Sequence, residues 1–290
     1  HTYPTPGSAD DSIPAYNFRL TFDNSSARKS PLPSSPPAGF DAQNYEIHLR
    51  WMAACTAAGQ PVAFTTIFNA QELRGTGRFD INNEGIISTN KAVINHNYPE
   101  ASYEERELIW QEVWNHIMGL WYVVQHHADA RVPSALRTAA LARGFAADHY
   151  YSPHENDEVF WNPQLYVREA RRLVSDVVMD ANHMAQTDDE TPTLGTHTVS
   201  VASYGMDSHM ENYFAHESSA GVWTYRAEGG MLLTESGGTD KMSPLPFEIF
   251  VPKVAECTNM SCSFGGSLSK VAYGASRMEF TAMQTAYTMG

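Results

Sequence analysis

The sequence predicts an α+β fold, in which a helical region is followed by a region of antiparallel strands. Before Thr187, apolar residues recur at helical spacing. Beyond it, apolar and polar residues alternate, as they do in strands with one buried face. Helices first and strands later is an α+β arrangement. We therefore expect residues 1–195 to be mainly helical and residues 196–290 to be rich in strands.

The first expected helix follows a proline- and serine-rich stretch, Ser30–Phe40, which predicts an extended loop because proline fixes φ and lacks an N–H donor. Asp41 is a suitable N-cap, and the helix is expected to reach about Cys55. Its buried side would carry Tyr45, Leu49 and Met52.

The second expected helix has the strongest local signal in the chain. Ser102 and Glu105 have the spacing of a capping box, in which the serine side chain and the glutamate each satisfy a free backbone amide of the other. The helix is expected to end near Gln125. Its apolar stripe predicts a core helix and consists of Ile109, Val113, Ile117, Trp121 and Val124.

Two further helices are expected before residue 187. One begins at Pro133 and ends at Gly144, and the other begins at Asn162-Pro163 with proline in its first turn. The buried stripe of the latter would be Tyr166, Ala170, Leu173 and Val177. Arg168 and Arg172 fall one turn apart on another face, either as a solvated surface or as functional residues.

The strands are expected in the last third of the chain. "THTVSVASY", residues 196–204, alternates in polarity. "GVWTYRAEGGMLL", residues 221–233, predicts two strands joined at Gly229-Gly230, since adjacent glycines favour tight turns.

The composition limits the possible functions. A formal net charge of −14 argues against binding to nucleic acid or to anionic membranes, and no apolar run is long enough to cross a bilayer. The sequence opens with His1 and has no leader-like pattern, so we expect a processed product or a piece of a longer protein. Sequons at Asn24 and Asn259 favour a secreted glycoprotein. Cys257 and Cys262 either form a local bridge or, with Cys55, remain separate thiols.

Standard catalytic and nucleotide-binding motifs are absent: the sequence contains no GxGxxG, GxxxxGK[ST], HExxH or GxSxG. His209 lies two residues after Asp207 near a predicted strand, and is either a general acid or base or a hydrogen-bonded structural histidine. His1 raises a separate possibility, because an N-terminal histidine offers both its amine and its ring to copper.

Eight stretches of the chain resemble segments of one known family and lie in that family's order. The most specific are "LYVREARR", residues 165–172, and "AYGASRME", residues 272–279. The others are "IPAYNFRLTF", "AGFDAQNYEIHLR", "DINNEGIISTN", "NYPEASYEERELIWQEV", "GFAADHYY" and "SYGMDSHM". The chain thus resembles the FAD-dependent oxidoreductases, large two-domain flavoproteins in which the glycine-rich FAD-binding segment precedes "AYNFRL". The resemblance therefore implies a substrate-domain portion whose dinucleotide-binding segment lies upstream or on a separate N-terminal chain.

The resemblance also implies site residues. The segment that approaches the flavin matches Ser269, Lys270, Gly274, Arg277 and Glu279, with FAD bound only when the N-terminal segment is present. We assign His209 and Arg168 to the substrate side from their chemistry. The chain departs from the family at Lys270, where a histidine is usual, and at Pro246–Glu248, where a "PYR"-like stretch is usual.

Three functional hypotheses follow from these observations. The first is a secreted FAD-dependent oxidoreductase that oxidises a small organic molecule, such as a sugar, an alcohol or a phenolic compound. The second is a flavin-free binding or structural module on the same scaffold. The third is a copper enzyme that uses His1.

Overall fold

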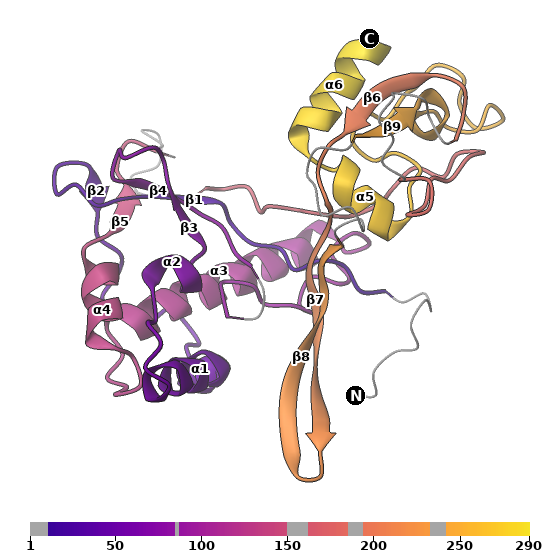
Figure 1. Ribbon diagram of the computed structural model, residues 1–290. Helices are drawn as coiled ribbons and strands as arrows, with labels where there is room; N and C mark the ends of the chain where they lie inside the picture. Colours follow the sequence, from indigo (N-terminus) through magenta and orange to yellow (C-terminus); the bar gives the residue numbers. More distant parts are fainter. Residues whose placement is uncertain (1–10, 85–86, 150–161, 185–193, 233–241) are drawn as a thin grey trace. The chain divides into compact units, whose positions relative to one another are not determined.

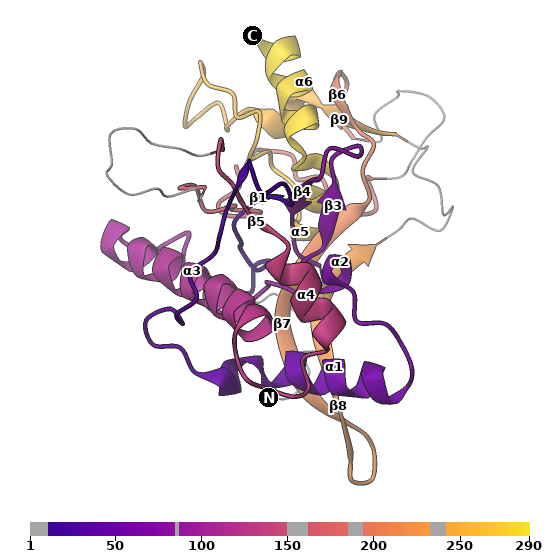
Figure 2. The same cartoon turned by 90° about the vertical axis from the view of Figure 1, so that its left-hand side faces the viewer.

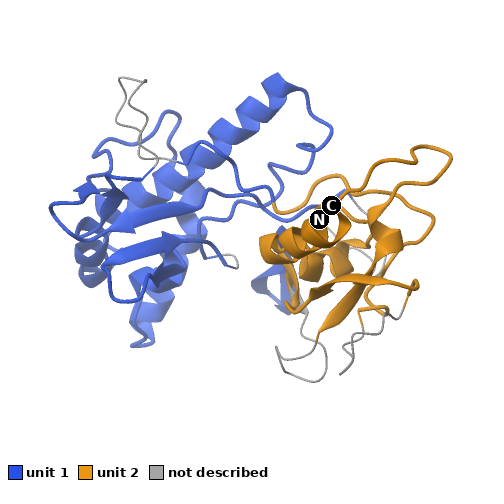
Figure 3. Cartoon of the chain, turned by 90° about the horizontal axis from the view of Figure 1, so that it is seen from above, with its two compact units in different colours: residues 1–167, 210–227 blue, residues 168–209, 228–290 orange. Residues whose placement is uncertain are grey.

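The computed structural model describes residues 11–84, 87–149, 162–184, 194–232 and 242–290. The chain forms two compact units (Figure 3). Unit 1 consists of residues 1–167 and 210–227, and unit 2 of residues 168–209 and 228–290. Each unit is considered by itself. The sequence predicts a different division, at residue 195, between a helical part and a strand-rich part. That division stays a prediction.

The sheet of unit 1 has five short antiparallel strands in the order β2-β5-β1-β4-β3. The strands are β1 (Leu20–Asp23), β2 (Lys29–Ser30), β3 (Ala70–Glu72), β4 (Arg78–Ile81) and β5 (Gly144–Ala146). None of the five is predicted by the sequence pattern, because strands of two to four residues are too short to show a period of two. The mixture of helices and antiparallel strands confirms the predicted α+β class.

Four helices accompany this sheet: α1 (Glu46–Ala57), α2 (Phe64–Ile67), α3 (Tyr103–Gln125) and α4 (Ser134–Leu141). Helix α3 confirms the second predicted helix, including the capping box of Ser102 and Glu105. In Figures 1 and 2, α1, α3 and α4 lie below the sheet. The predicted apolar stripe of α3 is buried in the core of the unit.

The two flanking helices agree with their predictions except at their ends. Asp41 caps a short 3₁₀ helix, Ala42–Tyr45, which leads directly into α1. Pro133 is the N-cap of α4 and not its first residue, and α4 ends at Leu141. Gly144 begins β5, because its backbone pairs with Asp23 of β1.

Aromatic side chains form the centre of the unit 1 core. Trp121 of α3 is 1% exposed and stacks on Phe68 and Phe22, with ring centroids 3.8 Å and 4.4 Å away. Arg143 lies over the rings of Phe64 and Phe79 at 4.3 Å and 4.5 Å. The stacking fixes α3 against the sheet and against the segment that contains α2.

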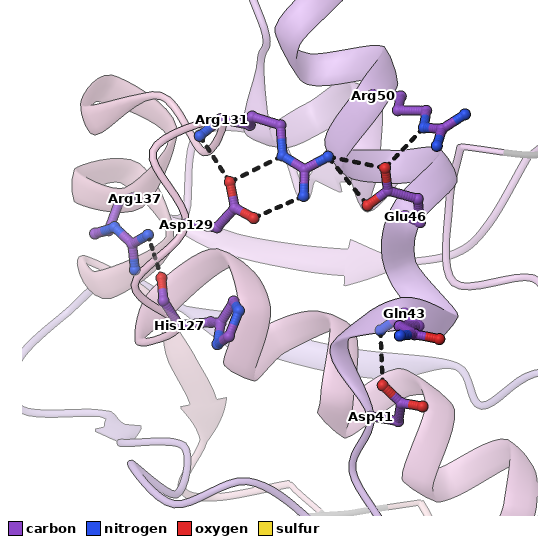
Figure 4. Close-up of polar contacts among 8 residues, drawn as sticks. All are labelled: Asp41, Gln43, Glu46, Arg50, His127, Asp129, Arg131 and Arg137. Atoms are coloured by element: carbon purple, nitrogen blue, oxygen red, sulfur yellow. Dashed lines mark hydrogen bonds and ion pairs between the residues drawn. The ribbon is translucent and has the colours of Figure 1, made fainter.

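A network of charged side chains joins α1 to the loop between α3 and α4 (Figure 4). Arg131 donates to Asp129 through Nε and Nη2, at 3.0 Å and 2.8 Å, and through Nη1 to both carboxylate oxygens of Glu46 at 3.0 Å. Arg50 donates to Glu46 at 2.7 Å, one helical turn away. The hydrogen bond from Arg131 lowers the pKa of Asp129 to about 2, and bonds from Arg131 and Arg50 lower the pKa of Glu46.

This network predicts a modest loss of stability in acid. The folded-state pKa of Asp129 lies below its unfolded value, so its stabilisation is present above about pH 4 and is lost between about pH 4 and pH 2. We expect Asp129→Asn to lower the urea midpoint at about pH 6 and to make little difference at about pH 2.5, with a small effect because solvent screens the pair. Glu107→Gln is the control, because Glu107 is exposed and has no ion pair within the described residues. An equal difference at both pH values would contradict the prediction.

The helix predicted from Asn162 to about Val177 is wrong. The structure has an extended chain there, with a bridge from Tyr166 to Asn17 and another from Met179 to Leu268. Leu173 donates its backbone N–H to Gly265 at 2.7 Å, and Met179 donates to Ser267 at 3.0 Å. The backbone amides of this segment therefore bond to residues 265–267 instead of to the carbonyl one turn earlier, which excludes an α-helix.

The predicted strand 196–204 is confirmed as β6 (Thr198–Ala202), which pairs with β9 (Ser243–Pro246) in unit 2. The turn at Gly229-Gly230 is wrong, because both glycines lie inside one strand, β8 (Val222–Leu232). Strand β8 pairs with β7 (Met206–Ser219) in a two-stranded ribbon. The ribbon turns at Ala220-Gly221, where Gly221 has a φ of +76°.

Unit 2 also contains two helices, α5 (Lys270–Ser276) and α6 (Glu279–Met289), which follow one another closely at the end of the chain. The buried cluster of the unit combines residues from β6, β9, α5 and the extended segment, among them Ala202, Leu245, Tyr273 and Met179. This packing holds the start of α5 beside the extended segment, since Ser269 donates its N–H to the Met179 carbonyl at 2.8 Å.

Candidate functional site

The candidate site lies in unit 2, where α5 meets the beginning of β7. Asp207 and His209 are two residues apart on β7, so both side chains point to the same face of the strand. Arg277 is the C-cap residue of α5. The structure thus brings together His209 and Arg277, which the sequence analysis placed in the site, around Asp207, which it noted only as the neighbour of His209.

The ion pair of Arg277 and Asp207 is the centre of this cluster. Arg277 Nη2 lies 2.9 Å from Asp207 Oδ2, and Arg277 Nε is 3.5 Å from the Asp207 backbone carbonyl. The two side chains are 6% and 11% exposed, so the pair is almost completely shielded from water. A buried carboxylate needs such a partner, because burying a lone charge is costly.

His209 lies on the other side of the same carboxylate, with Nε2 3.3 Å from Asp207 Oδ2. Burial lowers the pKa of His209, and the charges of Arg168 and Arg277 lower it further against the opposing effect of Asp207. Burial alone would raise the pKa of Asp207, but His209, Arg277 and Arg168 together lower it. At neutral pH the cluster therefore holds an ionised aspartate and a neutral histidine.

Arg168 is 2% exposed and lies in the extended segment of unit 2. Its charge acts on both Asp207 and His209, so it belongs to the same electrostatic cluster. Arg168 is therefore not on a solvated face, contrary to the simpler of the two interpretations of its helical spacing. Arg172, the other arginine of that pattern, donates to the Leu268 carbonyl at 3.0 Å and pairs with the buried Glu169.

Gly274 lies inside α5, where the helix packs against β7. A Cβ atom at this position would lie 2.7 Å from the Asp207 carbonyl oxygen and 2.9 Å from its backbone nitrogen. Glycine thus permits a close approach of backbone to backbone, and the group approached within the chain is Asp207. The expectation that Gly274 approaches a flavin stays a prediction.

The remaining three predicted residues lie at helix starts. Ser269 is the N-cap of α5 and accepts from the Ala272 amide at 3.3 Å, which is a structural role. Lys270 is the first residue of α5 and is half-buried. Glu279 is the first residue of α6 and is exposed, where its charge complements the helix dipole. The roles of these three residues toward a cofactor stay predictions.

Asp207 and Glu248 are not among the site residues predicted from the sequence. For Asp207 the available signal was its position two residues before His209. Glu248, in the stretch that departs from the family, accepts from the Thr196 amide at 3.1 Å and from its hydroxyl at 2.8 Å. Within the described residues, this carboxylate secures the loop before β6.

Comparison with known proteins decides the family. A family model described as FAD dependent oxidoreductase matches residues 3–290, which is nearly the entire chain. The chain belongs to the FAD-dependent oxidoreductase family. No curated protein and no solved structure matches the chain. The family membership supports a general oxidoreductase activity and suggests FAD as the cofactor.

The residues of unit 2 fit one part of a flavin, its redox-active ring. Two buried arginines, Arg168 and Arg277, can stabilise negative charge that develops during reduction. The residues do not provide the glycine-rich turn that normally holds the pyrophosphate of an FAD, because the sequence contains no GxGxxG.

Other parts of the family-based interpretation can be compared with the described residues. No helix among them combines the length and apolar character needed to cross a membrane. They contain no group of three or more His, Cys, Asp or Glu side chains able to hold a metal ion. His1, on which the copper hypothesis rests, lies outside the described residues. Cys55, Cys257 and Cys262 are all free thiols, so the local bridge is not present.

Proposed function

We propose that this chain is the substrate-domain portion of a secreted FAD-dependent oxidoreductase, which oxidises a small organic molecule once a dinucleotide-binding segment completes it. The observation that carries the proposal is the buried cluster of Asp207, His209, Arg277 and Arg168 in a chain of this family. A sugar, an alcohol or a phenolic compound would all present the hydroxyl group that such a cluster can act upon. The segment that completes the site would lie upstream or on a separate chain.

His209 is the proposed catalytic base. With Nε2 directed at Asp207, the neutral ring keeps a lone pair on Nδ1 that can accept a proton from a substrate hydroxyl. Asp207 fixes the ring orientation and stabilises the imidazolium that forms. Arg277 holds Asp207 in place, and Arg168 keeps His209 neutral before the reaction through its positive charge.

FAD, when bound, supplies the two-electron acceptor for the carbon that loses hydrogen. The residues proposed to lie nearest its ring are Lys270 and Arg277, with Ser269, Gly274 and Glu279 in the same segment. An arginine suits this position because its guanidinium stays charged at any working pH.

The proposed roles of His209 and Arg277 can be separated in the complete flavoprotein. We expect His209→Ala to lower turnover at least about 100-fold with flavin occupancy unchanged, which is the usual size of a general-base contribution. Arg277→Ala should lower flavin occupancy, measured by absorbance against protein concentration.

Turnover is screened with sugars, alcohols and phenolics and an artificial electron-accepting dye. His216→Ala is the control, because His216 lies in the β7–β8 ribbon away from Asp207 in the sequence. If Arg277→Ala keeps full occupancy and His209→Ala loses flavin, the two roles are reversed.

The 290-residue chain alone is expected to bind FAD weakly. A pyrophosphate is held by backbone amides of a glycine-rich turn at a helix N-terminus, and the sequence has no such motif. Titration of the purified chain with FAD, followed by flavin fluorescence, measures this directly. Tight one-to-one binding would contradict the expectation. If the complete protein also shows no flavin absorbance, the alternative is favoured, which is a flavin-free binding or structural module.

Secretion and glycosylation are part of the proposal. Asn24 and Asn259, the acceptors of the two sequons, are both exposed, so an oligosaccharide could be attached without unfolding the chain. Intact mass before and after glycosidase treatment of the native protein tests this feature.

A further inference from the structure

Unit 1 contains two neighbouring pockets on adjacent faces of α3, both covered by the loop that precedes α1. The first is aromatic, with a volume of about 210 Å³, and its walls include Leu32, Pro36, Trp114, Met118 and Tyr122. The second is polar, with a volume of about 240 Å³, and its walls include Asp41, Asn44, Lys91, Glu112 and Asn115.

Two features show that the pockets are neighbours. Pro37 lines both of them. Phe40 of the polar pocket and Tyr122 of the aromatic pocket are in edge-to-face contact, with ring centroids 5.0 Å apart. A molecule with an apolar ring and a polar substituent could therefore place one part in each pocket.

The aromatic pocket selects for a flat ring. Trp114 is half-buried and lines the pocket together with Pro33, Pro36 and Pro37 of the loop, so a planar ligand can pack between an indole and proline rings. Trp121 also borders the pocket, but its ring already stacks on Phe68 and Phe22. Aromatic rings gain from such stacking beyond the burial of apolar area. Small-molecule sites combine apolar walls of this kind with a few polar groups that fix orientation.

The polar pocket selects against an anion. Lys91 is neutralised by Glu112 at 2.9 Å, and Asp41 adds a second carboxylate, so an anion would meet uncompensated negative charge. Asn44 and Asn115 offer amide groups that both donate and accept, which matches a hydroxyl. Asn115 Oδ1 accepts from Gln111 at 3.2 Å, which leaves its amide NH₂ to donate.

A buried histidine in the wall gives the polar pocket a second distinguishing feature. His116 is 6% exposed and lines the pocket, and neither ring nitrogen makes a hydrogen bond of ordinary geometry within the described residues. Burial lowers the pKa of His116 to about 3, with smaller effects from His48 and Lys91 and an opposing effect of the Asn90 backbone, so the ring is neutral. The imidazole therefore adds no charge to the wall of the pocket.

We propose that these pockets are the two halves of one binding site for a small neutral molecule that consists of an aromatic ring and a hydroxyl-bearing substituent. The ring lies against Trp114, and the hydroxyls meet Asn44 and Asn115. This site lies within unit 1 and does not depend on the flavin site proposed for unit 2.

Isothermal titration calorimetry of the 290-residue chain tests the site without flavin. The probe is phenyl β-glucoside, compared with phenol, with methyl β-glucoside and with the anion 4-hydroxybenzoate. We expect the phenyl glucoside to bind at least about tenfold more tightly than either part alone, because linking two binding groups makes the second contact intramolecular. The anion should bind more weakly than phenol.

Two pairs of variants show whether the named side chains form the site. Trp114→Ala and Asn115→Ala should each weaken phenyl glucoside binding about tenfold, which corresponds to about 1.4 kcal/mol. The matched controls are Trp223→Ala in the β7–β8 ribbon, where Trp223 is 66% exposed, and Asn97→Ala at an exposed asparagine outside the pocket. Circular dichroism checks that each variant folds. If Trp114→Ala does not fold, Asn115→Ala still tests the site, because Asn115 is only partly buried. Absence of binding at millimolar probe, or equal binding by all four variants, would overturn the proposal.

Discussion

Replacement of Arg277 by alanine is expected to destabilise unit 2 by about 3–5 kcal/mol, the largest effect of any single substitution in the site. The side chain of Asp207 is 11% exposed, and Arg277 is its direct partner at 2.9 Å. Removing the guanidinium leaves a carboxylate that is still excluded from water. Urea denaturation at neutral pH, followed by circular dichroism, measures the loss.

The pH dependence of this variant gives a more specific test. Without Arg277, one of the three groups that lower the pKa of Asp207 is lost, so the folded-state pKa rises from its depressed value while His209 and Arg168 remain. A carboxyl pKa that is less depressed contributes less stability at neutral pH, and the difference from the wild type is lost as pH falls through the folded-state pKa values. The part of the Arg277→Ala defect that comes from Asp207 ionisation should therefore be smaller in acid, where the carboxyl is protonated, than at neutral pH.

A double variant isolates the interaction from the loss of packing. Asp207→Ala combined with Arg277→Ala removes both charges, and we expect it to be more stable at neutral pH than Arg277→Ala alone. If the double variant loses the sum of the two single effects, the pair is not coupled and the interpretation of the cluster is wrong.

Gly274→Ala is expected to destabilise unit 2 by about 1–3 kcal/mol, although alanine is the better helix former by about 1 kcal/mol. The added methyl group would lie 2.7 Å from the Asp207 carbonyl oxygen, which belongs to the backbone and cannot rotate away. Helix α5 must then move from β7, and the Arg277–Asp207 pair is stretched with it. The variant should therefore share the pH dependence of Arg277→Ala.

The propensity contribution can be measured separately with Ala286→Gly on the exposed side of α6. That change lacks a steric component and should cost at most about 1 kcal/mol. The sign of the change in the free energy of unfolding separates the two effects, because Gly274→Ala should be destabilising although helix propensity alone predicts a gain. An unchanged or raised urea midpoint for Gly274→Ala would show that α5 is not packed against Asp207 as described.

Local sequence patterns determined the helices that carry their own start signals. The capping box at Ser102 and the apolar stripe behind it specify α3, and Asp41 specifies the beginning of the α1 region. These features act within one or two turns of chain, so they can be recognised without the rest of the fold.

The tertiary structure decided the segments where local and distant partners compete. Residues 162–177 have a helical apolar spacing, yet their backbone amides bond to residues 265–267 and Tyr166 pairs with Asn17. Gly229-Gly230 is a good turn sequence, but both glycines lie within β8, which pairs with β7, and the ribbon turns at Ala220-Gly221. A short stretch of sequence does not include the distant residues that these segments bond to, so it cannot predict the outcome.

The candidate site shows the same contrast between what the sequence predicts and what the tertiary structure decides. His209 and Arg277 could be selected from the sequence, from residue chemistry and from resemblance to a family that the comparison with known proteins then confirmed. Their meeting at Asp207 joins positions that are 70 residues apart, across Gly274 and beside the buried Arg168. The sequence by itself determined which charged groups were available. Only the fold decided which of them were buried together, because the effect of a charge on a pKa depends on distance and on exclusion of water, and packing sets both.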